Sequence, residues 1–425
     1  MTTDIKNRIE AVNRGEVPEG YKRENGYIIP YEWDTSELKN VFLRSTKKNH
    51  IGCDNVLTIS AQMGLISQRD FYEKDIASED KSEYYLMKNG DFAYNKSYSA
   101  GYDYGAIKRL DKYTEGVVSP LYICMTPQSE TNSDFYVQYF EAGRYNREIY
   151  RFAQEGARNH GLLNIAVEDF FNGVVVVPSE TEQQKIAEIL ATCDKVIELK
   201  QKLIEEKRRQ KKWLLQKLLN PDSGVRLPGF EGSKWENVRI EKLGDIITGS
   251  TPSRTNEDYW NGPFPWISAQ DFNGKYIGET KESVTELGMR QCRILPKGTV
   301  LVTCIASIGL NAITTEECAT NQQINAIVCS QKYDNEFVFY AVENISDYLQ
   351  KIAGKTAVPI ISKGVFSKTE INVPISKQEQ ISIAEILSGF DNAIEKYEQE
   401  LAEWQQKKKA LMQLLLTGLV RVKGD

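Results

Sequence analysis

Residues 182–190 read EQQKIAEIL and residues 379–387 read EQISIAEIL, so the chain contains this stretch twice, at an offset of 197 residues. Each copy opens a run of about 38 residues in which apolar side chains recur at alternating steps of four and three. The apolar positions of the first run are Ile186, Leu190, Cys193, Ile197, Ile204, Leu214 and Leu218, with Lys200, Lys207 and Lys211 filling the gaps in the spacing. Those of the second run are Ile383, Leu387, Phe390, Ile394, Tyr397, Leu401, Trp404, Leu411 and Leu415. A period of 3.5 residues predicts a helix packed lengthwise on another helix.

Helices of this length are unusual inside one globular domain, since 1.5 Å per residue gives a rod of roughly 57 Å. We therefore expect the two helices to pack on each other. The alternative is a long amphipathic helix with a solvated, charged face, which the duplication disfavours. The first helix should begin just after Pro178, with Ser179 or Thr181 as its cap.

The composition places limits on the class of protein. A length of 425 residues predicts two or three domains with their own cores. The sequence has neither 18 successive apolar residues nor the apolar run of a signal peptide at its start. Seven cysteines without a Cys-x-x-Cys pair, and only two histidines, argue against a zinc site or a disulfide framework and favour a reduced cytoplasm. The net charge of −6 is unusual for a nucleic-acid binder, but local charge can differ from the average.

A second, weaker repeat surrounds the helices. Residues 34–177 combine short β-branched runs with turn-rich loops, and show helical periodicity only around 135–153, which predicts an α+β globule. Residues 221–373 repeat this globule. The predicted strands of the first globule include Val56–Ile59, Phe92–Tyr94, Leu121–Ile123 and Val174–Val177.

The best-preserved part of this second repeat is the sequence ISAQ, which stands at 59–62 and again at 267–270. Residues 1–33 resemble the end of a long helix and its exit turn, so the repeat is circular. The predicted segments are an N-terminal helix and turn, a globule, a long helix, a second globule and a second long helix, at 1–33, 34–177, 178–220, 221–373 and 374–425. Such a pattern indicates two modules that perform one task on two different targets.

Signatures of catalysis are incomplete. Residues 354–356 (GKT) end like a phosphate-binding loop, but Leu349 stands where its first glycine should be. Asp271, Glu279 and Lys281 have the loose spacing of a metal-dependent nuclease, which arises by chance in a chain this polar and has no counterpart in the first globule. We expect no catalytic residue and no metal ligand, and keep the nuclease as a minor alternative.

The chain resembles the specificity (S) subunits of type I restriction–modification systems over essentially its whole length. The resemblance rests on the doubled Pro-x(3–4)-Glu-Gln-x-x-Ile-Ala-Glu-Ile-Leu unit with its long helix, and on ordered motifs in the second globule. These are GDIITGSTPS at 244–253, PWIS at 265–268, LPKGTVL at 295–301, SIG at 307–309, NQ at 321–322 and GKTA at 354–357. The first globule departs from the pattern, because the GxTPS motif is degenerate at residues 45–48.

The resemblance implies a non-catalytic subunit with two target-recognition domains, each of which reads one half of a bipartite, gapped DNA site. The fold it implies is α+β, with two long antiparallel coiled-coil helices that separate the domains in a pseudo-twofold repeat. The helices would dock two methyltransferase (M) subunits, and endonuclease–translocase (R) subunits would join the assembly. S-adenosylmethionine, ATP and Mg²⁺ would then belong to the partners.

DNA-reading residues should be polar side chains on loops, because hydrogen bonds distinguish base edges in the grooves. In the first domain the candidates are Lys47, Lys48, Asn49, Gln62, Asn95, Lys96, Tyr98, Tyr102, Arg158 and Asn159. In the second they are Thr251, Ser253, Arg254, Gln270, Asn321, Gln322, Gln323, Lys355 and Lys363. The repeated Gln62 and Gln270 fit phosphate contacts better, since identical residues do not distinguish two half-sites.

Partner subunits should dock near the repeated segments and on apolar positions outside the seam. The candidates are Glu182, Gln183, Ile189, Val196, Glu379, Gln380 and Ile386, with Leu203 and Leu215 on the same stripe. The rival interpretation is a coiled-coil adaptor that binds protein and no DNA. The adaptor interpretation explains the helices but does not explain why the two globules carry different sets of polar loop residues.

Deletion of one heptad, residues 394–400, tests whether the helices set the gap between the half-sites. Two related modules can address one face of B-DNA with half-sites roughly 10 base pairs apart. The deletion shortens a helix by about 10 Å, or roughly three base pairs, and keeps the seam in register. We expect a methylome with a changed gap and unchanged half-sequences. Methylation at the original spacing would show that the helices do not measure the gap.

Overall fold

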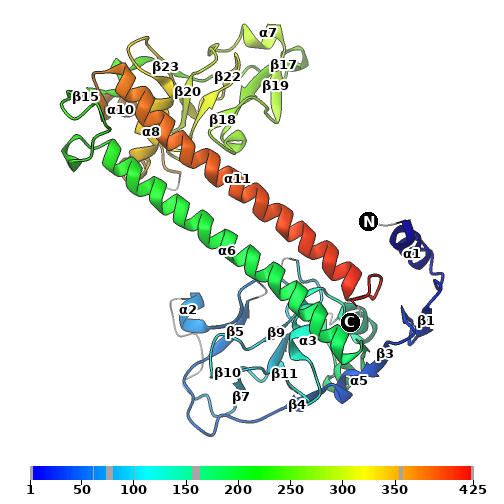
Figure 1. Ribbon diagram of the computed structural model, residues 1–425. Helices are drawn as coiled ribbons and strands as arrows, with labels where there is room; N and C mark the ends of the chain where they lie inside the picture. Colours follow the sequence, from blue (N-terminus) through cyan, green and yellow to red (C-terminus); the bar gives the residue numbers. More distant parts are fainter. Residues whose placement is uncertain are drawn as a thin grey trace. The chain divides into compact units, whose positions relative to one another are not determined.

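The computed structural model describes residues 3–60, 62–72, 80–99, 101–155, 163–353 and 358–422 (Figure 1). It divides into two compact units, the first made of residues 1–199 and 400–425, the second of residues 200–399. Helix α6 (Glu180–Leu218) begins in the first unit and ends in the second. Helix α11 (Lys377–Leu415) begins in the second unit and ends in the first. Each unit therefore contains the start of one long helix and the end of the other.

Both long helices contain 39 residues and start two residues before the repeated EQ pair. The backbone N–H of Glu182 donates to the Ser179 hydroxyl (3.4 Å), and that of Glu379 donates to the Ser376 hydroxyl (3.4 Å). Serine oxygens accept from the first turn of a helix, whose N–H groups have no partner within the helix. The predicted start after Pro178 and the predicted cap at Ser179 are confirmed.

The first unit is built on a four-stranded antiparallel sheet in the order β4-β11-β8-β9. Its strands are Phe42–Ser45, Ile123–Pro127, Phe92–Asn95 and Ala106–Arg109. Further strands pair two by two: β1 (Tyr21–Glu24) with β2 (Tyr27–Pro30), β3 (Asp34–Glu37) with β14 (Val174–Val177), β5 (Leu57–Ser60) with β6 (Gly64–Ser67), β7 (Tyr85–Lys88) with β10 (Glu115–Val118), and β12 (Gln154–Glu155) with β13 (Leu163–Asn164). The short helices are α1 (Thr3–Asn13), α2 (Gln68–Tyr72), α3 (Ser133–Glu141), α4 (Asn146–Phe152) and α5 (Val167–Asn172).

The second unit repeats this plan in a five-stranded sheet of order β16-β23-β20-β21-β18. Its strands are Gly244–Thr248, Ile324–Cys329, Val300–Thr303, Asn311–Thr314 and Tyr276–Ile277. A three-stranded sheet contains β19 (Glu282–Val284), β17 (Trp260–Ile267) and β22 (Ala319–Thr320), and β15 (Trp235–Arg239) pairs with β24 (Glu370–Pro374). The short helices are α7 (Glu286–Met289), α8 (Asn335–Asn344), α9 (Ser346–Ile352) and α10 (Lys363–Lys368).

The sheets confirm the predicted α+β globules, with two differences in the first unit. The helical stretch expected at 135–153 is two helices, α3 and α4, because Gly143 between them has a φ of 64° that ends the first. The strand expected at 121–123 begins only at Ile123, since residues 119–122 form a turn in which the Tyr122 N–H donates to the Ser119 carbonyl.

Each unit has a core that includes the start of one long helix. In the first unit Ile186 and Leu190 are buried with Met412, Leu415 and aromatic residues of α3. The aromatic rings include Phe42, Phe92, Phe135, Tyr136, Tyr139 and Phe140, which meet edge to face or tilted. In the second unit Ile383 and Leu387 are buried with Leu215 and Leu218. Apolar burial of about 25 cal/mol per Å² makes these contacts the main stabilising term within each unit.

The same ion pair occurs in both units. In the first, Lys408 of α11 contacts Asp194 of α6 at 2.5 Å. In the second, Lys211 of α6 contacts Asp391 of α11 at 2.7 Å and Glu343 at 2.9 Å. Both pairs are related by the sequence offset of 197. The long helices therefore run antiparallel within each unit, which confirms the predicted pairing of the two helices.

The buried carboxylate of Glu182 joins the N-terminal and C-terminal segments of the first unit. Glu182 is 2% exposed and accepts from the Trp33 indole (2.7 Å) and from Nε and Nη2 of Arg421 (2.7 and 2.8 Å). Burial alone would raise the pKa of Glu182, but the bonds from Arg421 and Trp33 hold it below its ordinary value. Nearby, the Tyr21 hydroxyl donates to the Gly418 carbonyl (2.6 Å). The first 33 residues and the last residues thus meet in one unit, which explains the circular repeat.

Replacement of Arg421 by alanine should destabilise the first unit by about 3 kcal/mol or more, because it leaves the buried carboxylate of Glu182 without its charged partner. Hydrogen–deuterium exchange of the full chain, read separately for the two units, measures this. The matched control is Glu32→Gln, which removes the more exposed carboxylate that also pairs with Arg421 (2.6 Å) and should cost about 1 kcal/mol or less. Equal effects of the two substitutions would contradict the assigned role of Glu182.

Candidate nucleic-acid interface

Two loops of the second unit are joined at the ends of the main sheet. The Ser250 N–H donates to the Thr320 carbonyl (2.8 Å), and the Thr251 hydroxyl donates to Oε1 of Gln322 (2.6 Å). Gly249 allows this approach, because a Cβ there would lie 2.1 Å from the Asn321 carbonyl oxygen. The structure therefore brings together four of the predicted residues in loops 249–255 and 321–323. They are Thr251, Asn321, Gln322 and Gln323.

Ser253 and Arg254 continue the first of these loops. The Arg254 guanidinium lies 4.3 Å from the ring centre of Trp260 and contacts both carboxylate oxygens of Glu282, with Nη2 at 2.9 Å from Oε2. This contact lowers the pKa of Glu282. The Ser253 and Thr255 hydroxyls lie 2.8 Å apart. The side chains of Arg254 and Glu282 are 54% and 41% exposed, so a ligand can reach both.

Gln270 lies on the surface beside a capped turn. Its Oε1 accepts from Lys281 Nζ at 3.3 Å. The Asp271 carboxylate accepts from the Ser268 N–H and hydroxyl (both 2.8 Å) and from the Lys281 N–H (3.1 Å), so Asp271 is a capping residue. Its oxygens are thus taken by the fold, which disfavours the nuclease alternative. Over the residues that the structure describes, no group of three His, Cys, Asp or Glu side chains is arranged to hold a metal ion.

Lys363 is exposed at the first turn of α10. Lys355 lies outside the described residues, as do Arg158 and Asn159 of the first unit.

Residues 47–49 of the first unit have different environments. Lys47 is exposed, whereas Lys48 donates to the carbonyl and carboxylate of Glu83 (2.8 and 2.9 Å). Asn49 is 6% exposed, and its amide bonds both the N–H and the carbonyl of Cys53. The structure corrects the expectation for Asn49, because a side chain whose polar atoms close its own turn is not available to a base edge.

Asn95 is the last residue of strand β8, and Lys96 and Tyr98 follow it. The Asn95 side chain accepts from the Ser97 N–H (3.0 Å), and Lys96 donates to the Ile165 carbonyl (3.2 Å). Burial lowers the pKa of Lys96. Tyr98 is 59% exposed. Among these three, Tyr98 is thus the residue most accessible to DNA, and a ring of this kind can stack on a base. Gln62, earlier in the chain, is also exposed.

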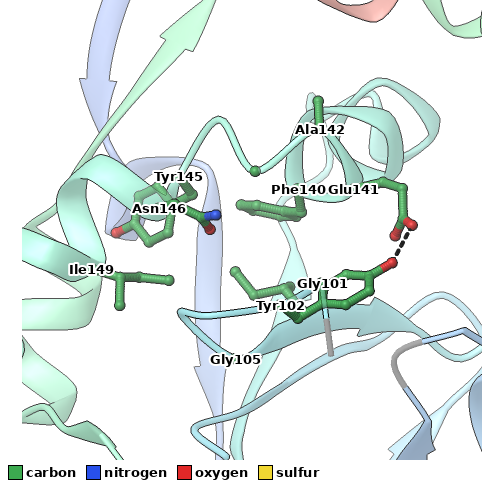
Figure 2. Close-up of a pocket in the computed structure, with 11 residues that line it drawn as sticks. Gly101, Tyr102, Gly105, Phe140, Glu141, Ala142, Tyr145, Asn146 and Ile149 are labelled. Carbon is green, nitrogen blue, oxygen red and sulfur yellow. Dashed lines mark hydrogen bonds between the residues drawn. The ribbon is translucent and has the colours of Figure 1, made fainter. Parts of the chain in front are cut away.

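Tyr102 lies at the edge of a cavity of about 250 Å³ between residues 101–107 and helices α3 and α4 (Figure 2). Its hydroxyl donates to Oε1 of Glu141 (2.5 Å) and accepts from Nζ of Lys108 (3.2 Å), and burial raises its pKa. Figure 2 shows Phe140, Tyr145 and Ile149 on the apolar walls of the cavity. Tyr102 therefore holds its loop against α3 through the bond to Glu141, and we interpret it as a residue that positions this loop.

Several residues of these surfaces were not predicted as DNA-reading residues. Glu282, Trp260 and Lys281 contact predicted residues of the second unit, and Lys108 and Glu141 contact Tyr102. Their partners lie between 6 and 39 residues away in the sequence, without a helical or strand period that relates them.

The structure also corrects the expected docking residues. Glu182, Gln183, Glu379 and Gln380 are at most 7% exposed, so they do not form a docking surface. The Gln183 and Gln380 amides donate to the carbonyls of Pro178 and Pro374 (both 2.9 Å), which fixes the turn before each helix. Leu215 is likewise buried, in the core of the second unit.

The remaining docking candidates are accessible. Ile189 and Ile386 are 36% and 38% exposed at equivalent positions of the two long helices. Val196 is half-buried, and Leu203 is 37% exposed. No described helix is long and apolar enough to cross a membrane.

Two related α+β units, each with polar loops beside its sheets and with shared long helices, define a duplicated recognition scaffold. Residues 232–403 match the family model described as the type I restriction modification DNA specificity domain. The chain is 35% identical to the type I restriction enzyme MjaIX specificity subunit of Methanocaldococcus jannaschii over 168 residues, which are 38% of this chain and 39% of that one. This match thus spans about two fifths of the relative. The chain is therefore similar to the specificity subunits of type I restriction–modification systems.

Two further matches cover most of the chain. The putative type I restriction enzyme MjaX specificity subunit of the same organism is 25% identical over 427 residues, which cover 95% of this chain and 97% of that protein. A crystal structure of the S subunit of a type I restriction–modification system from M. genitalium has a TM-score of 0.57 at 15% identity, over 93% of this chain and 97% of that one. This structural likeness concerns the fold.

Proposed function

We propose that the chain is the DNA-reading, non-catalytic subunit of a type I restriction–modification complex, and that each unit reads one half of a bipartite, gapped sequence. One observation carries this proposal: the units share a scaffold but differ in their loops. The strand order β4-β11-β8-β9 corresponds to β16-β23-β20-β21, and both long helices start in the same way. The loops that follow the equivalent strands β4 and β16 differ, however: residues 46–49 read TKKN, whereas residues 249–255 read GSTPSRT. A shared frame with different polar contacts suits two different half-sequences.

The loops supply the groups that such a task needs. Thr251, Gln322 and Arg254 offer hydroxyl, amide and guanidinium groups that can bond base edges in a groove. Exposed Lys47 and Lys363 are suited to phosphate contacts. Since a net charge of −6 gives the chain little general attraction for DNA, we infer that partner subunits provide most phosphate contacts.

The partners would be two methyltransferase (M) subunits and the endonuclease–translocase (R) subunits. S-adenosylmethionine, ATP and Mg²⁺ would bind to those partners and supply the methyl-transfer and translocation chemistry. The equivalent exposed side chains of Ile189 and Ile386 suit one M subunit at the start of each long helix. A cytoplasmic location agrees with the free thiols of Cys53, Cys124, Cys193, Cys292, Cys304, Cys318 and Cys329.

Selection from a library of random DNA duplexes tests this function. The complex of the chain with its M subunits should enrich two short sequences at a fixed separation. The pure chain with DNA, Mg²⁺, ATP and S-adenosylmethionine should leave the DNA unchanged, and turnover that survives repurification would contradict the non-catalytic role. An assembled complex that enriches no sequence would instead favour the coiled-coil adaptor.

The double variant Ile189→Lys/Ile386→Lys tests the docking surface. Two lysines placed on exposed apolar positions should weaken binding of M subunits by about tenfold or more, because an apolar contact would have to desolvate a charge. Co-purification of the tagged chain with M subunits measures the effect. Leu121→Lys, at a 72% exposed position in a turn of the first unit, is the matched control and should bind normally. If the double variant also binds normally, the docking site lies elsewhere.

A further inference from the structure

The second unit holds an exposed guanidinium in a fixed plane. Arg254 lies 4.3 Å from the ring centre of Trp260 and 5.1 Å from that of Trp266. The two indoles meet edge to face at 5.2 Å, and Trp266 is 3% exposed, so the wall behind the guanidinium belongs to the core. At the end of the Arg254 side chain, Nη1 and Nη2 contact the two carboxylate oxygens of Glu282. The wall and the carboxylate together restrict both the position and the rotation of the side chain.

The supports of this arginine are themselves held by the sheet. Glu282 on β19 stands directly opposite Trp266 on β17 in the antiparallel register. The Trp260 indole donates to the Ser253 carbonyl (3.1 Å), and the Trp266 indole donates to the Ser250 carbonyl (3.1 Å). Both tryptophans therefore bind the loop that carries Arg254. A side chain arranged in this way loses little conformational entropy when it binds a ligand.

The contact with Glu282 leaves part of the guanidinium unused. Arginine has five N–H donors, and a carboxylate that faces Nη1 and Nη2 takes one from each. The Nε–H and the outer N–H of Nη2 then form a free edge with two parallel donors. Such an edge fits two neighbouring acceptors, as in the O6 and N7 atoms of guanine or two oxygens of a phosphate.

The charge of Glu282 decides between these two ligands. A phosphate at the free edge would lie close to a carboxylate of the same sign, which opposes binding. The guanine edge is neutral, and the cytosine paired with it presents an N4 amino donor that a glutamate can accept. A joined arginine and glutamate therefore match the donor and acceptor pattern of a C·G pair in the major groove.

We propose that Arg254 reads a guanine in the half-site of the second unit, with Trp260 and Glu282 as positioning residues and Glu282 directed to the paired cytosine. This inference rests on the proposed DNA-reading function.

The test compares variants in the full complex with M subunits by selection from random duplexes. Arg254→Ala should reduce the preference for guanine at one position of one half-site by between about fivefold and 150-fold. Arg254→Lys should not restore it, because an ammonium lacks two parallel donors. Glu282→Gln should weaken the preference at the same base pair. Arg239→Ala, which removes an exposed arginine elsewhere in the second unit, is the control and should leave both half-sites unchanged.

The other half-site serves as an internal standard for folding and assembly, since a misfolded complex would lose both. Loss of affinity for all sequences alike, with a smaller dependence on salt, would overturn the inference in favour of a phosphate contact. An unchanged preference in Arg254→Ala would overturn it as well. If the unaltered complex selects no sequence, the proposed function fails before the variants are compared.

Discussion

The buried carboxylate at the start of each long helix is the contact on which each unit depends. A carboxylate withdrawn from water must be bonded, or it costs several kcal/mol. Glu182 meets this requirement with Trp33 and Arg421, and Glu379 with the Trp235 indole (3.2 Å). Each indole bond joins the helix to the segment that precedes its module, and the Arg421 bond joins α6 to the segment after α11. The helix start, the entry strand and the core are therefore fixed together.

The two units satisfy this requirement differently. In the second, Arg226 corresponds to Arg421, but its guanidinium lies 5.4 Å from the ring centre of Trp235 and donates to backbone carbonyls, among them that of Val225 (2.8 Å). Oε2 of Glu379 consequently has no hydrogen-bond partner in the described chain. The indole contact is common to both units and the arginine contact is not. The two units thus share the backbone arrangement and the indole contact, but they differ in the contact made by the arginine.

The sequence predicted the elements whose signals are periodic. The 3.5-residue seam predicted α6 and α11, and β-branched runs predicted strands such as β5, β8 and β14. Prediction from the sequence failed where the repetition of a residue could reflect either a docking surface or a role in the fold. Glu182 and Gln380 were assigned to a docking surface because they recur, but burial of an anchor preserves a residue in two copies equally well. Only the fold shows which explanation applies.

The candidate site was predictable in its residue types and loops, but not in its contacts. Loops 249–255 and 321–323 were identified from polar composition and order, and the structure joins them through Thr251 and Gln322. The partnership of Arg254 with Glu282 spans 28 residues and depends on the register of β17 and β19. A single sequence does not display such a register. Asn49 shows the opposite case, since a polar loop residue served the turn itself.

The circular closure of the first unit has a consequence for synthesis on the ribosome. The second unit is one continuous segment, residues 200–399, and all of it emerges before the residues that complete the first. The first unit needs contacts between residues 411 and 397 positions apart, from Arg8 to Leu419 and from Tyr21 to Gly418. Domains generally fold as units while the chain is made, so the module that is translated first is completed last. A nascent chain cut short before Gly418 would keep the second module and lose the contacts that complete the first.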